Sequence, residues 1–311
     1  MTTTGLFSQS IKELKNLYDK GVNISQYLRE KYSSENTSEI IEIAYDLQTG
    51  TYVEQMKKPE IKSFYRKRAE KLYNTVESLI DKPRSILEAG IGEGNFMGEL
   101  LPLFTDKPVA AGFDISWSRT ACARDYLAKK GLFNVKLHTG DLLNIPYMDN
   151  AFDIVYTNHA VEPNYEYEAD IIKELYRITS KYIVLFEPIY ELAGIEAQKR
   201  MESHRYVRNL KNTIMTLGIN IKEYKMLPAE YNLNELNPSG IIILEKDSAN
   251  SAIIEFNDKY ADPIFKTALK KVEGAYFSED SLRVYPIING IPCLRVENGI
   301  VASKYEKYND T

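Results

Sequence analysis

The stretch Ser85-Ile-Leu-Glu-Ala-Gly-Ile-Gly-Glu-Gly-Asn-Phe96 decides the fold of this chain. A short β-rich run leads into a turn with three glycines, and a helical stretch follows. Glycine tolerates left-handed backbone conformations and lets the main chain approach a ligand closely, while the first N–H groups of a helix are free to bind it. The dinucleotide fingerprint G-x-G-x-x-G needs glycine at position 95, where this chain has asparagine. The motif is instead acid-x-G-x-G-x-G, with Glu88 inside the strand.

Short β-rich runs alternate with helical stretches from residue 85 to residue 187. The expected strands are 85–89, 109–115, 135–139, 152–157 and 182–186, and the expected helices are 95–104, 119–129 and 169–178. Such alternation predicts a doubly wound, Rossmann-like α/β sheet that binds its ligand at the carboxyl ends of the parallel strands. A long helix at about 195–216 is expected next. Two strands, around 219–226 and 240–245, are expected to form an antiparallel edge of the sheet.

The pattern divides the chain into five zones. Residues 1–84 predict a helical N-terminal cap, because apolar residues recur there at helical spacing without strand-like alternation. Residues 85–246 hold the sheet, and residues 247–258 read as a linker. Residues 259–302 predict a small β-rich module with Asn-Gly turn signals, and residues 303–311 are a polar tail.

The composition excludes several classes of protein. With 44% apolar and 27% charged residues, the 311-residue chain is an ordinary globular protein rather than a disordered or fibrous one. No apolar run approaches the ~18 residues that a membrane helix needs, and the N-terminus lacks the pattern of a secretory signal. The formal net charge of −5 disfavours nucleic acid as a partner, so a small-molecule substrate is expected, with the oligomeric state left open. Two cysteines, Cys122 and Cys293, fit the reducing cytoplasm and are too few for a zinc ribbon.

From about residue 60 to 246 the chain resembles class I S-adenosylmethionine-dependent methyltransferases, on the glycine motif quoted above. In that family the motif wraps the amino acid part of the cofactor. The resemblance therefore implies that Glu88, Gly90 and Gly92 bind S-adenosylmethionine.

Four residues further along match the same family in order and spacing. Asp114 ends the second strand, where a carboxylate accepts both ribose hydroxyls. The resemblance implies that Asp141 binds the adenine amino group and that the backbone N–H of Leu142 reaches the ring. Asn158 ends the fourth strand, beside the sulfonium. Each acid taken alone could be a helix cap or a turn residue, but that explanation does not account for four matches in the order and spacing of the family.

Methyl transfer from a sulfonium is an in-line displacement, so the protein mainly aligns the acceptor and excludes water. A hydroxyl acceptor must also lose its proton, usually to a histidine. His159, in the loop after the fourth strand, is interpreted as either this base or a packing residue beside the cofactor. Glu162 has three interpretations: it orients the His159 imidazole, it binds substrate, or it is a loop carboxylate in water. His204, on the long helix, is the next catalytic candidate, although a surface histidine is the commoner case.

Two other arrangements of these groups were weighed. His138 alternates with apolar residues and is interpreted as structural. His159, Glu162 and Glu187 sit at strand ends and could share a hard cation, but no tight ligand spacing supports one, so no metal is expected.

The cap contributes two further candidates. Tyr52 and Tyr45 resemble the tyrosine-bearing lid helix of related methyltransferases. Arg68 lies 20 residues before Glu88, and the resemblance implies that it pairs with the cofactor carboxylate through a bidentate fork. It belongs to residues 57–71, which carry seven basic and two acidic side chains. A solvated helix face is the simpler interpretation of that segment, and an anion site with one inward-facing arginine is the alternative.

The segment 259–302 resembles the small zinc-ribbon activator proteins that partner methyltransferases acting on tRNA and translation release factors. The elements Tyr-Pro-Ile at 285–287 and Gly-Ile-Pro at 290–292 are retained. The four ligand positions hold no cysteine: they are Asp262, Phe265, Ser278 and Ser281. The resemblance therefore implies an activator-like module without zinc, fused in cis and docked on its own methyltransferase domain. An unrelated β-module is the alternative.

Together these patterns predict a cytoplasmic S-adenosylmethionine-dependent methyltransferase acting on a small polar acceptor. O-methylation of a carbohydrate or nucleotide-linked sugar is favoured by the acidic charge, the 23 tyrosines and a likeness of HAVEPN (159–164) and LFEP (185–188) to methyltransferases of surface-glycan biosynthesis. The first alternative is a tRNA or protein methyltransferase with a fused activator module. The second is a non-catalytic cofactor-binding scaffold.

Overall fold

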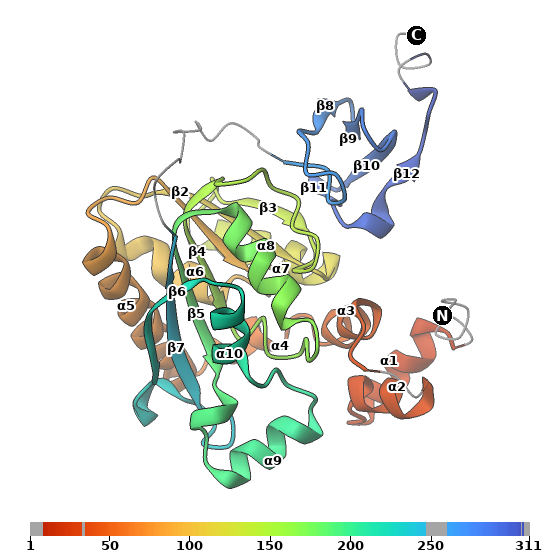
Figure 1. Ribbon diagram of the computed structural model, residues 1–311. Coiled ribbons are helices and arrows are strands. Elements are labelled where there is room, and N and C mark those ends of the chain that lie inside the picture. The colour runs from red at the N-terminus through yellow and green to blue at the C-terminus, as the bar shows by residue number, and fades with distance from the viewer. Residues whose placement is uncertain (1–8, 33–34, 247–259, 306, 308–311) are drawn as a thin grey trace.

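The computed structural model describes residues 9–32, 35–246, 260–305 and 307 (Figure 1). The linker expected at 247–258 lies outside the described residues, as do parts of the N-terminal cap and of the polar tail. Among the described residues, no helix combines the length and the apolar character needed to cross a membrane.

A seven-stranded sheet with the order β3-β2-β1-β4-β5-β7-β6 forms the centre of the molecule. The strands are β1 (Ser85–Ala89), β2 (Val109–Asp114), β3 (Lys136–Thr139), β4 (Phe152–Asn158), β5 (Thr179–Pro188), β6 (Asn220–Met226) and β7 (Ser239–Glu245). Strands β1 to β5 pair in parallel, while β7 pairs antiparallel with both β5 and β6. The Rossmann-like fold and its antiparallel edge, both predicted from the sequence, are therefore confirmed.

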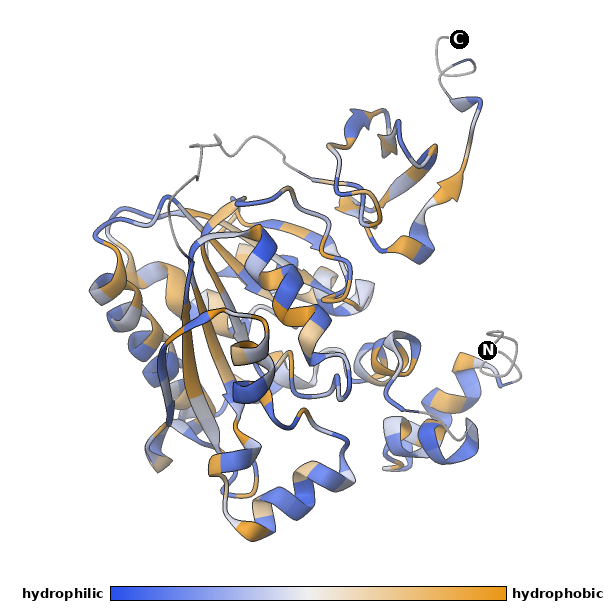
Figure 2. Cartoon of the chain, in the orientation of Figure 1, coloured by the Kyte–Doolittle hydropathy of each residue, from blue (hydrophilic) through white to orange (hydrophobic). Residues whose placement is uncertain are grey.

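Helices bury both faces of this sheet, which explains why its strands read as continuous apolar runs. On one face pack α5 (Pro59–Leu79), α6 (Asn95–Leu100) and α7 (Trp117–Lys129), and on the other α8 (Glu168–Ile178) and α10 (Leu210–Thr216). Successive residues of β1 alternate between the two cores, Ile86 in one and Leu87 in the other. Figure 2 shows the apolar strands enclosed between helices whose outer faces are hydrophilic.

The single long helix expected at 195–216 is wrong. The segment forms α9 (Ile195–Ser203) and α10, separated by an irregular stretch at 204–209. Arg205 and Asn209 adopt left-handed backbone angles there, with φ of 57° and 60°, which a continuous α-helix does not allow. His204 consequently caps the C-terminus of α9 instead of lying on a helix face.

The N-terminal cap contains α1 (Ile11–Asp19), α2 (Ile24–Tyr32), α3 (Ser38–Leu47) and α4 (Thr51–Gln55). Helices α1 to α3 have a small apolar core of their own. Helix α3 contacts α7, and the Asn36 amide donates to the carbonyls of Pro163 (2.8 Å) and His204 (3.4 Å). The cap therefore lies against the carboxyl ends of the strands.

The C-terminal module is a small sheet of β8 (Lys270–Val272), β9 (Ala275–Ser278), β10 (Arg283–Ile288), β11 (Ile291–Pro292) and β12 (Ile300–Val301). It lies beside β3 and α7 (Figure 1), and its apolar residues join the core of one sheet face. Those residues are Tyr260, Leu269, Tyr276, Tyr285 and Leu294.

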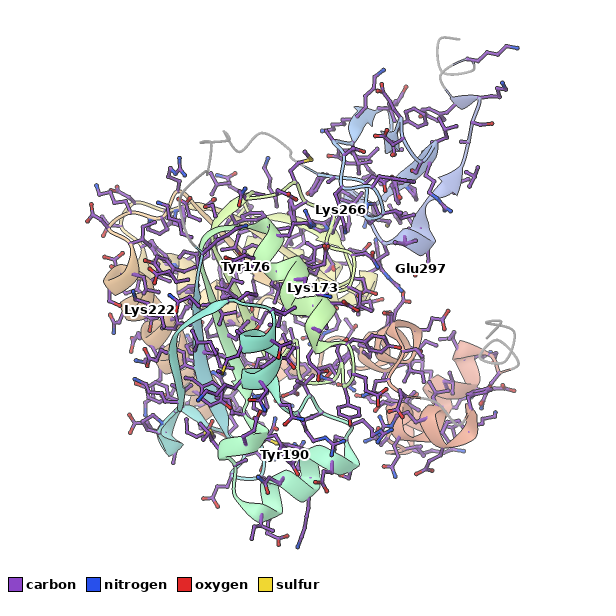
Figure 3. The ribbon with its side chains drawn as sticks, viewed as in Figure 1. Lys173, Tyr176, Tyr190, Lys222, Lys266 and Glu297 are labelled. Atoms are coloured by element: carbon purple, nitrogen blue, oxygen red, sulfur yellow. The ribbon has the colours of Figure 1, made fainter. Side chains whose placement is uncertain are left out.

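Polar contacts also tie the module to the rest of the chain. Lys266 pairs with Glu174 at the side of α8 (2.7 Å; Figure 3), and buried Arg295 pairs with Glu42 of the cap. His138 is fully buried beneath the module, where its ring meets Tyr260 edge to face. Burial lowers the pKa of His138 to about 4, as expected for a structural histidine.

The four positions that the sequence resemblance equates with zinc ligands lie around one carboxylate, that of Asp262. Asp262 is fully buried and accepts hydrogen bonds from the backbone N–H groups of Ile264 (2.7 Å) and Phe265 (2.9 Å) and from the Ser281 hydroxyl (2.5 Å). Ser278 in turn accepts from the Ser281 N–H (3.2 Å). Burial alone would raise the pKa of Asp262, but these hydrogen bonds hold it below the ordinary value.

Candidate active site

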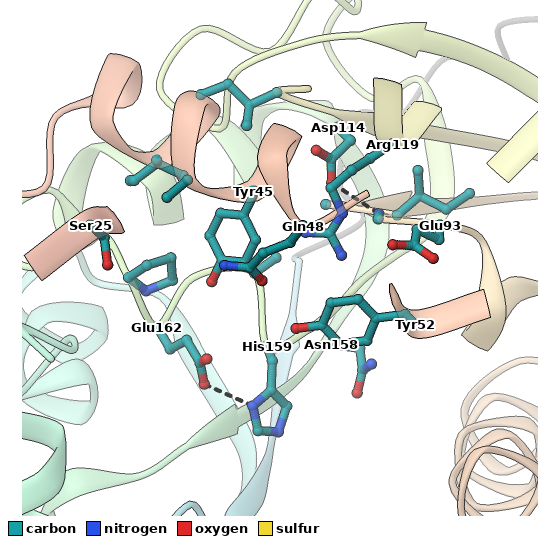
Figure 4. A pocket seen from close by; sticks show the side chains of 18 of the residues that line it. Ser25, Tyr45, Gln48, Tyr52, Glu93, Asp114, Arg119, Asn158, His159 and Glu162 are labelled. Carbon is teal, nitrogen blue, oxygen red and sulfur yellow. Dashed lines mark hydrogen bonds and ion pairs between the residues drawn. The ribbon is translucent and has the colours of Figure 1, made fainter. Parts of the chain in front are cut away.

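A cavity of about 650 Å³ opens at the carboxyl ends of β1, β2 and β4 and is walled on its outer side by the cap (Figure 4). Its size is within the range of sites that enclose a cofactor and a small substrate. All twelve residues expected from the sequence line it. They are Tyr52, Arg68, Glu88, Gly90, Gly92, Asp114, Asp141, Leu142, Asn158, His159, Glu162 and His204.

The glycine turn lies closer to its neighbours than any side chain would permit. Gly90 and Gly92 have φ of 77° and 57°. A Cβ on Gly90 would lie 2.3 Å from the Ala160 Cβ, and one on Gly92 would lie 2.8 Å from Arg119 Nη2. The left-handed backbone angle favours glycine at both positions, and at Gly90 the close approach of Ala160 also excludes a side chain.

Three carboxyl groups surround this turn. Glu88 is buried and accepts from the Tyr156 hydroxyl (2.8 Å), and burial raises its pKa to about 8. Asp114 accepts from the backbone N–H groups of Gly92 (2.9 Å) and Ser116 (3.0 Å). Asp141 accepts from the Leu143 N–H (2.9 Å). The backbone thus fixes each aspartate at the wall of the cavity while further lone pairs stay available to a ligand.

The loop after β4 carries the candidate catalytic residues. Asn158 ends the strand with a buried Oδ1 that has no hydrogen-bond partner, and His159 follows in a left-handed conformation (φ 59°). Buried Glu187 organises the loop, because its carboxylate accepts from the Thr157 hydroxyl (2.6 Å) and from the N–H groups of residues 160–162. Glu187 therefore supports the loop from behind.

Both ring nitrogens of His159 contact protein groups. Nδ1 lies 2.7 Å from a Glu162 carboxylate oxygen, drawn as a dashed line in Figure 4, and 3.2 Å from the Asn237 amide nitrogen. Nε2 lies 2.6 Å from the Ser239 hydroxyl and 3.3 Å from Arg68 Nη1. Among the described residues, no group of three or more His, Cys, Asp or Glu side chains is arranged to hold a metal ion.

Arg68 is the inward-facing arginine of the basic segment 57–71. It is only 2% exposed, whereas Lys62, Arg66 and Lys67 of the same helix are exposed. The solvated-face interpretation thus describes those neighbours and is wrong for Arg68. Burial lowers its pKa to about 10, and its Nε and Nη2 have no hydrogen-bond partner.

The cap is attached to the wall of the cavity by two residues that the sequence patterns did not single out. The Glu93 carboxylate accepts from the N–H groups of Gly50 (2.9 Å) and Val53 (2.7 Å) at the start of α4. The Arg119 guanidinium lies 5.0 Å from the ring centroids of both Tyr45 and Tyr52 (Figure 4), a distance typical of cation–π contacts.

His204 lines the opposite end of the cavity. Its Nδ1 lies 2.9 Å from the Arg200 carbonyl and 3.0 Å from the Ser203 hydroxyl. Partial burial lowers its pKa. Its position at the end of α9 leaves it on the acceptor side, away from the glycine turn.

Residues 86–181 match a family model described as a methyltransferase domain. The chain contains a methyltransferase domain. A curated relative of this chain, ajmaline N-methyltransferase from Rauvolfia serpentina, is 28% identical over 153 residues. The match covers 48% of this chain and 51% of the relative, so the chain spans about half the length of the curated protein.

Solved structures share the fold of this chain at low sequence identity. Magnesium protoporphyrin IX methyltransferase from Synechocystis PCC 6803, with bound SAH, is 13% identical with a TM-score of 0.52, over 68% of this chain and 100% of that one. A putative S-adenosyl-L-methionine-dependent methyltransferase from Methanococcus maripaludis is 18% identical (TM-score 0.50; 71% and 99% covered). A [4+2]-cyclase is 16% identical (TM-score 0.52; 68% and 97% covered).

Proposed function

We propose that this chain is an S-adenosylmethionine-dependent methyltransferase acting on a small polar acceptor. One observation carries the proposal: the glycine turn, two backbone-anchored aspartates and a buried arginine with free N–H groups converge on a single cavity within a methyltransferase domain. The cap closes this cavity, which favours chemistry from which water is excluded.

The residues around the cavity fit this cofactor. Gly90 and Gly92 form a turn that no side chain could fill, and together with Arg68 they would hold the amino acid part. Asp114 would bind the ribose, and Asp141 with the Leu142 N–H the adenine. The unpaired Asn158 Oδ1 would lie near the sulfonium. The bound cofactor supplies an electrophilic methyl group, and the chain orients the acceptor against it.

For the acceptor we favour a hydroxyl of a carbohydrate or nucleotide-linked sugar. Support comes from the polar lining of the acceptor side of the cavity, which offers amide and guanidinium groups to a hydroxyl-rich ligand. These groups belong to Asn23, Asn234, Asn237 and Arg200, whereas the amides of Asn36 and Asn164 donate to backbone carbonyls.

An amine is the second candidate acceptor, favoured by two observations. The curated relative is named as an N-methyltransferase. Both nitrogens of His159 already contact protein groups, and an amine that is neutral when it attacks needs no base at Nε2.

The activator-like module supports a different substrate class. Its four ligand-equivalent positions still converge, with Asp262 where a metal would bind. A tRNA or protein substrate is therefore tested as well, although the net charge of −5 disfavours nucleic acid. A non-catalytic scaffold is tested as well, because cofactor binding by itself does not establish methyl transfer.

A transfer assay with methyl-labelled S-adenosylmethionine separates these classes. Nucleotide sugars, small amines, bulk tRNA and protein extract are offered in parallel, with Asp114→Ala as the control. Label transfer to a sugar or amine by the wild-type chain alone supports the proposal. Transfer only to tRNA or protein would replace it with the activator-type function, and transfer to none of the four despite cofactor binding would support the scaffold.

A further inference from the structure

A chain of hydrogen bonds links four residues that are far apart in the sequence. Arg68 Nη1 lies 3.0 Å from the Ser239 hydroxyl oxygen, which lies 2.6 Å from His159 Nε2, and His159 Nδ1 lies 2.7 Å from a Glu162 oxygen. Arg68, Ser239 and Glu162 are 2%, 1% and 7% exposed, whereas the His159 side chain is 23% exposed and lines the cavity.

With a neutral imidazole at His159, the chemistry of the two ends sets the direction of every bond. A guanidinium only donates, and an ionised carboxylate only accepts. Arg68 therefore donates to Ser239, the Ser239 hydroxyl donates to His159 Nε2, and the Nδ1–H of His159 donates to Glu162. A second weak donation from Arg68 Nη1 reaches the Tyr231 carbonyl at 3.5 Å. These contacts hold one terminal nitrogen of the guanidinium in place.

The nitrogens left over are Nε and Nη2, both buried and without a partner. They form one edge of the guanidinium, the edge that binds a carboxylate in a bidentate fork. Arg68 is absent from the ion pairs among the described residues, and a buried unpaired cation is costly. Arg68 lines the cavity, so pinning Nη1 leaves the Nε/Nη2 edge as the part of the guanidinium that can bind an anion there.

We propose that Ser239 is a positioning residue that, with His159 and Glu162, aims the Nε/Nη2 edge of Arg68 at the cofactor carboxylate. This inference rests on the proposed function. On this inference the His159–Glu162 pair serves cofactor binding, and it does not take a proton from the acceptor.

The backbone holds Ser239 firmly enough for such a role. Its N–H donates to Asn232 Oδ1 (2.8 Å), and it pairs with Pro188 at the start of β7. The next residue, Gly240, has no room for a side chain, because a Cβ there would lie 2.1 Å from Ile189 Cδ1 and 2.8 Å from the Lys225 carbonyl oxygen. The Ser239 side chain is thus fixed in direction by the sheet edge.

Serine, histidine and glutamate in this order also make up a nucleophilic triad. Two features favour positioning instead. An acyl donor has little access to a side chain that is 1% exposed, and the Ser239 oxygen already accepts from Arg68.

Two cofactor-like ligands isolate the carboxylate. S-adenosylhomocysteine carries the amino acid part, and 5′-methylthioadenosine lacks it, so a role at the carboxylate affects only the first. We expect Ser239→Ala to weaken the binding of S-adenosylhomocysteine about 10- to 150-fold by calorimetry, the size of one hydrogen bond to a charged group. Binding of methylthioadenosine should stay within about twofold. Ser239→Thr, which keeps the hydroxyl, should restore most of the loss.

Two further variants complete the test. Arg68→Lys keeps the charge but not the fork, and adding Ser239→Ala to it should cause no further loss. Ser180→Ala is the matched control, because Ser180 is a buried serine that donates to the Asp153 carboxylate (3.1 Å). The Ser180→Ala variant should bind both ligands with wild-type affinity.

Three results would overturn the inference. They are equal weakening of both ligands by Ser239→Ala, additive losses in the double variant, and covalent labelling of Ser239 by a fluorophosphonate probe. If the wild-type chain bound neither ligand, the proposed function itself would fail, which is a distinct outcome.

Discussion

The attachment of the cap to the glycine turn depends on the Glu93 carboxylate. Removal of this carboxylate should release the cap without unfolding the sheet. Glu93 lies inside the glycine turn and is 2% exposed. Its two oxygens accept from the Gly50 N–H at 2.9 Å and the Val53 N–H at 2.7 Å, which are free donors at the start of α4. We therefore choose Glu93→Ala as the perturbation.

The expected magnitude follows from these two contacts. A hydrogen bond to a charged group contributes about 1.5–3 kcal/mol, so two give about 3–6 kcal/mol as an upper bound. Water can bind both N–H groups once the cap has opened, which reduces the loss to about 2–4 kcal/mol. At 1.4 kcal/mol per tenfold change, the opening equilibrium should rise about 30- to 1000-fold.

Hydrogen exchange at Gly50 and Val53 measures this opening directly. Both amides should exchange faster in Glu93→Ala by that factor, while amides of β1 and β4 keep their protection. Glu99→Gln is the control, because Glu99 is an equally buried carboxylate that pairs with Lys130 (2.7 Å) and does not contact the cap. Exchange at Gly50 and Val53 within twofold of wild type would refute the reasoning.

Three further predictions concern pH, the module and its missing metal. Burial raises the pKa of Glu88 to about 8, so the folded state favours its neutral form. The free energy of unfolding should therefore fall as the pH rises through 8. Urea unfolding at pH 6 and pH 9 should show a smaller fall for Glu88→Gln than for the wild-type chain, because glutamine does not titrate. Truncation after residue 246 uncovers the apolar surface beneath Tyr260 and Leu294 and should lower the melting temperature, whereas unchanged melting would make the module an independent unit. A variant with cysteine at positions 262, 265, 278 and 281, in place of Asp262, Phe265, Ser278 and Ser281, should bind one zinc ion per chain in a thiolate competition assay. No zinc uptake by this variant would count against the activator resemblance.

Local sequence patterns were sufficient for the cofactor side of the site. The turn at Gly90 and Gly92 and the acids Asp114 and Asp141 follow successive strands, so their spacing along the chain translates into one edge of the sheet. Arg68 and Tyr52 required the family resemblance, because a helix alone does not reveal which of its faces is buried.

The residues that escaped prediction act through contacts between distant segments. Ser239 lies 171 positions from Arg68 and 80 from His159, and a serine before a strand carries no local signal of such a partner. Glu93 sits inside the quoted motif, but its role depends on where α4 begins. The break at 204–209 contains two non-glycine residues with positive φ, Arg205 and Asn209, where the apolar spacing still suggested a helix.

Calorimetric titration of the wild-type chain and of Asp114→Ala with S-adenosylmethionine and NAD tests the central claim most directly. The N–H groups of Gly90 and Ile91 donate to the Phe113 carbonyl (3.0 and 2.8 Å) and hold the turn without the Asp114 side chain. Loss of that side chain should therefore remove the group proposed to bind the ribose while the turn stays in place. We predict that S-adenosylmethionine binds the wild-type chain and that Asp114→Ala weakens it by about 1–3 kcal/mol, with no binding of NAD. Binding of NAD, or equal affinity of Asp114→Ala and wild type for S-adenosylmethionine, would contradict the account.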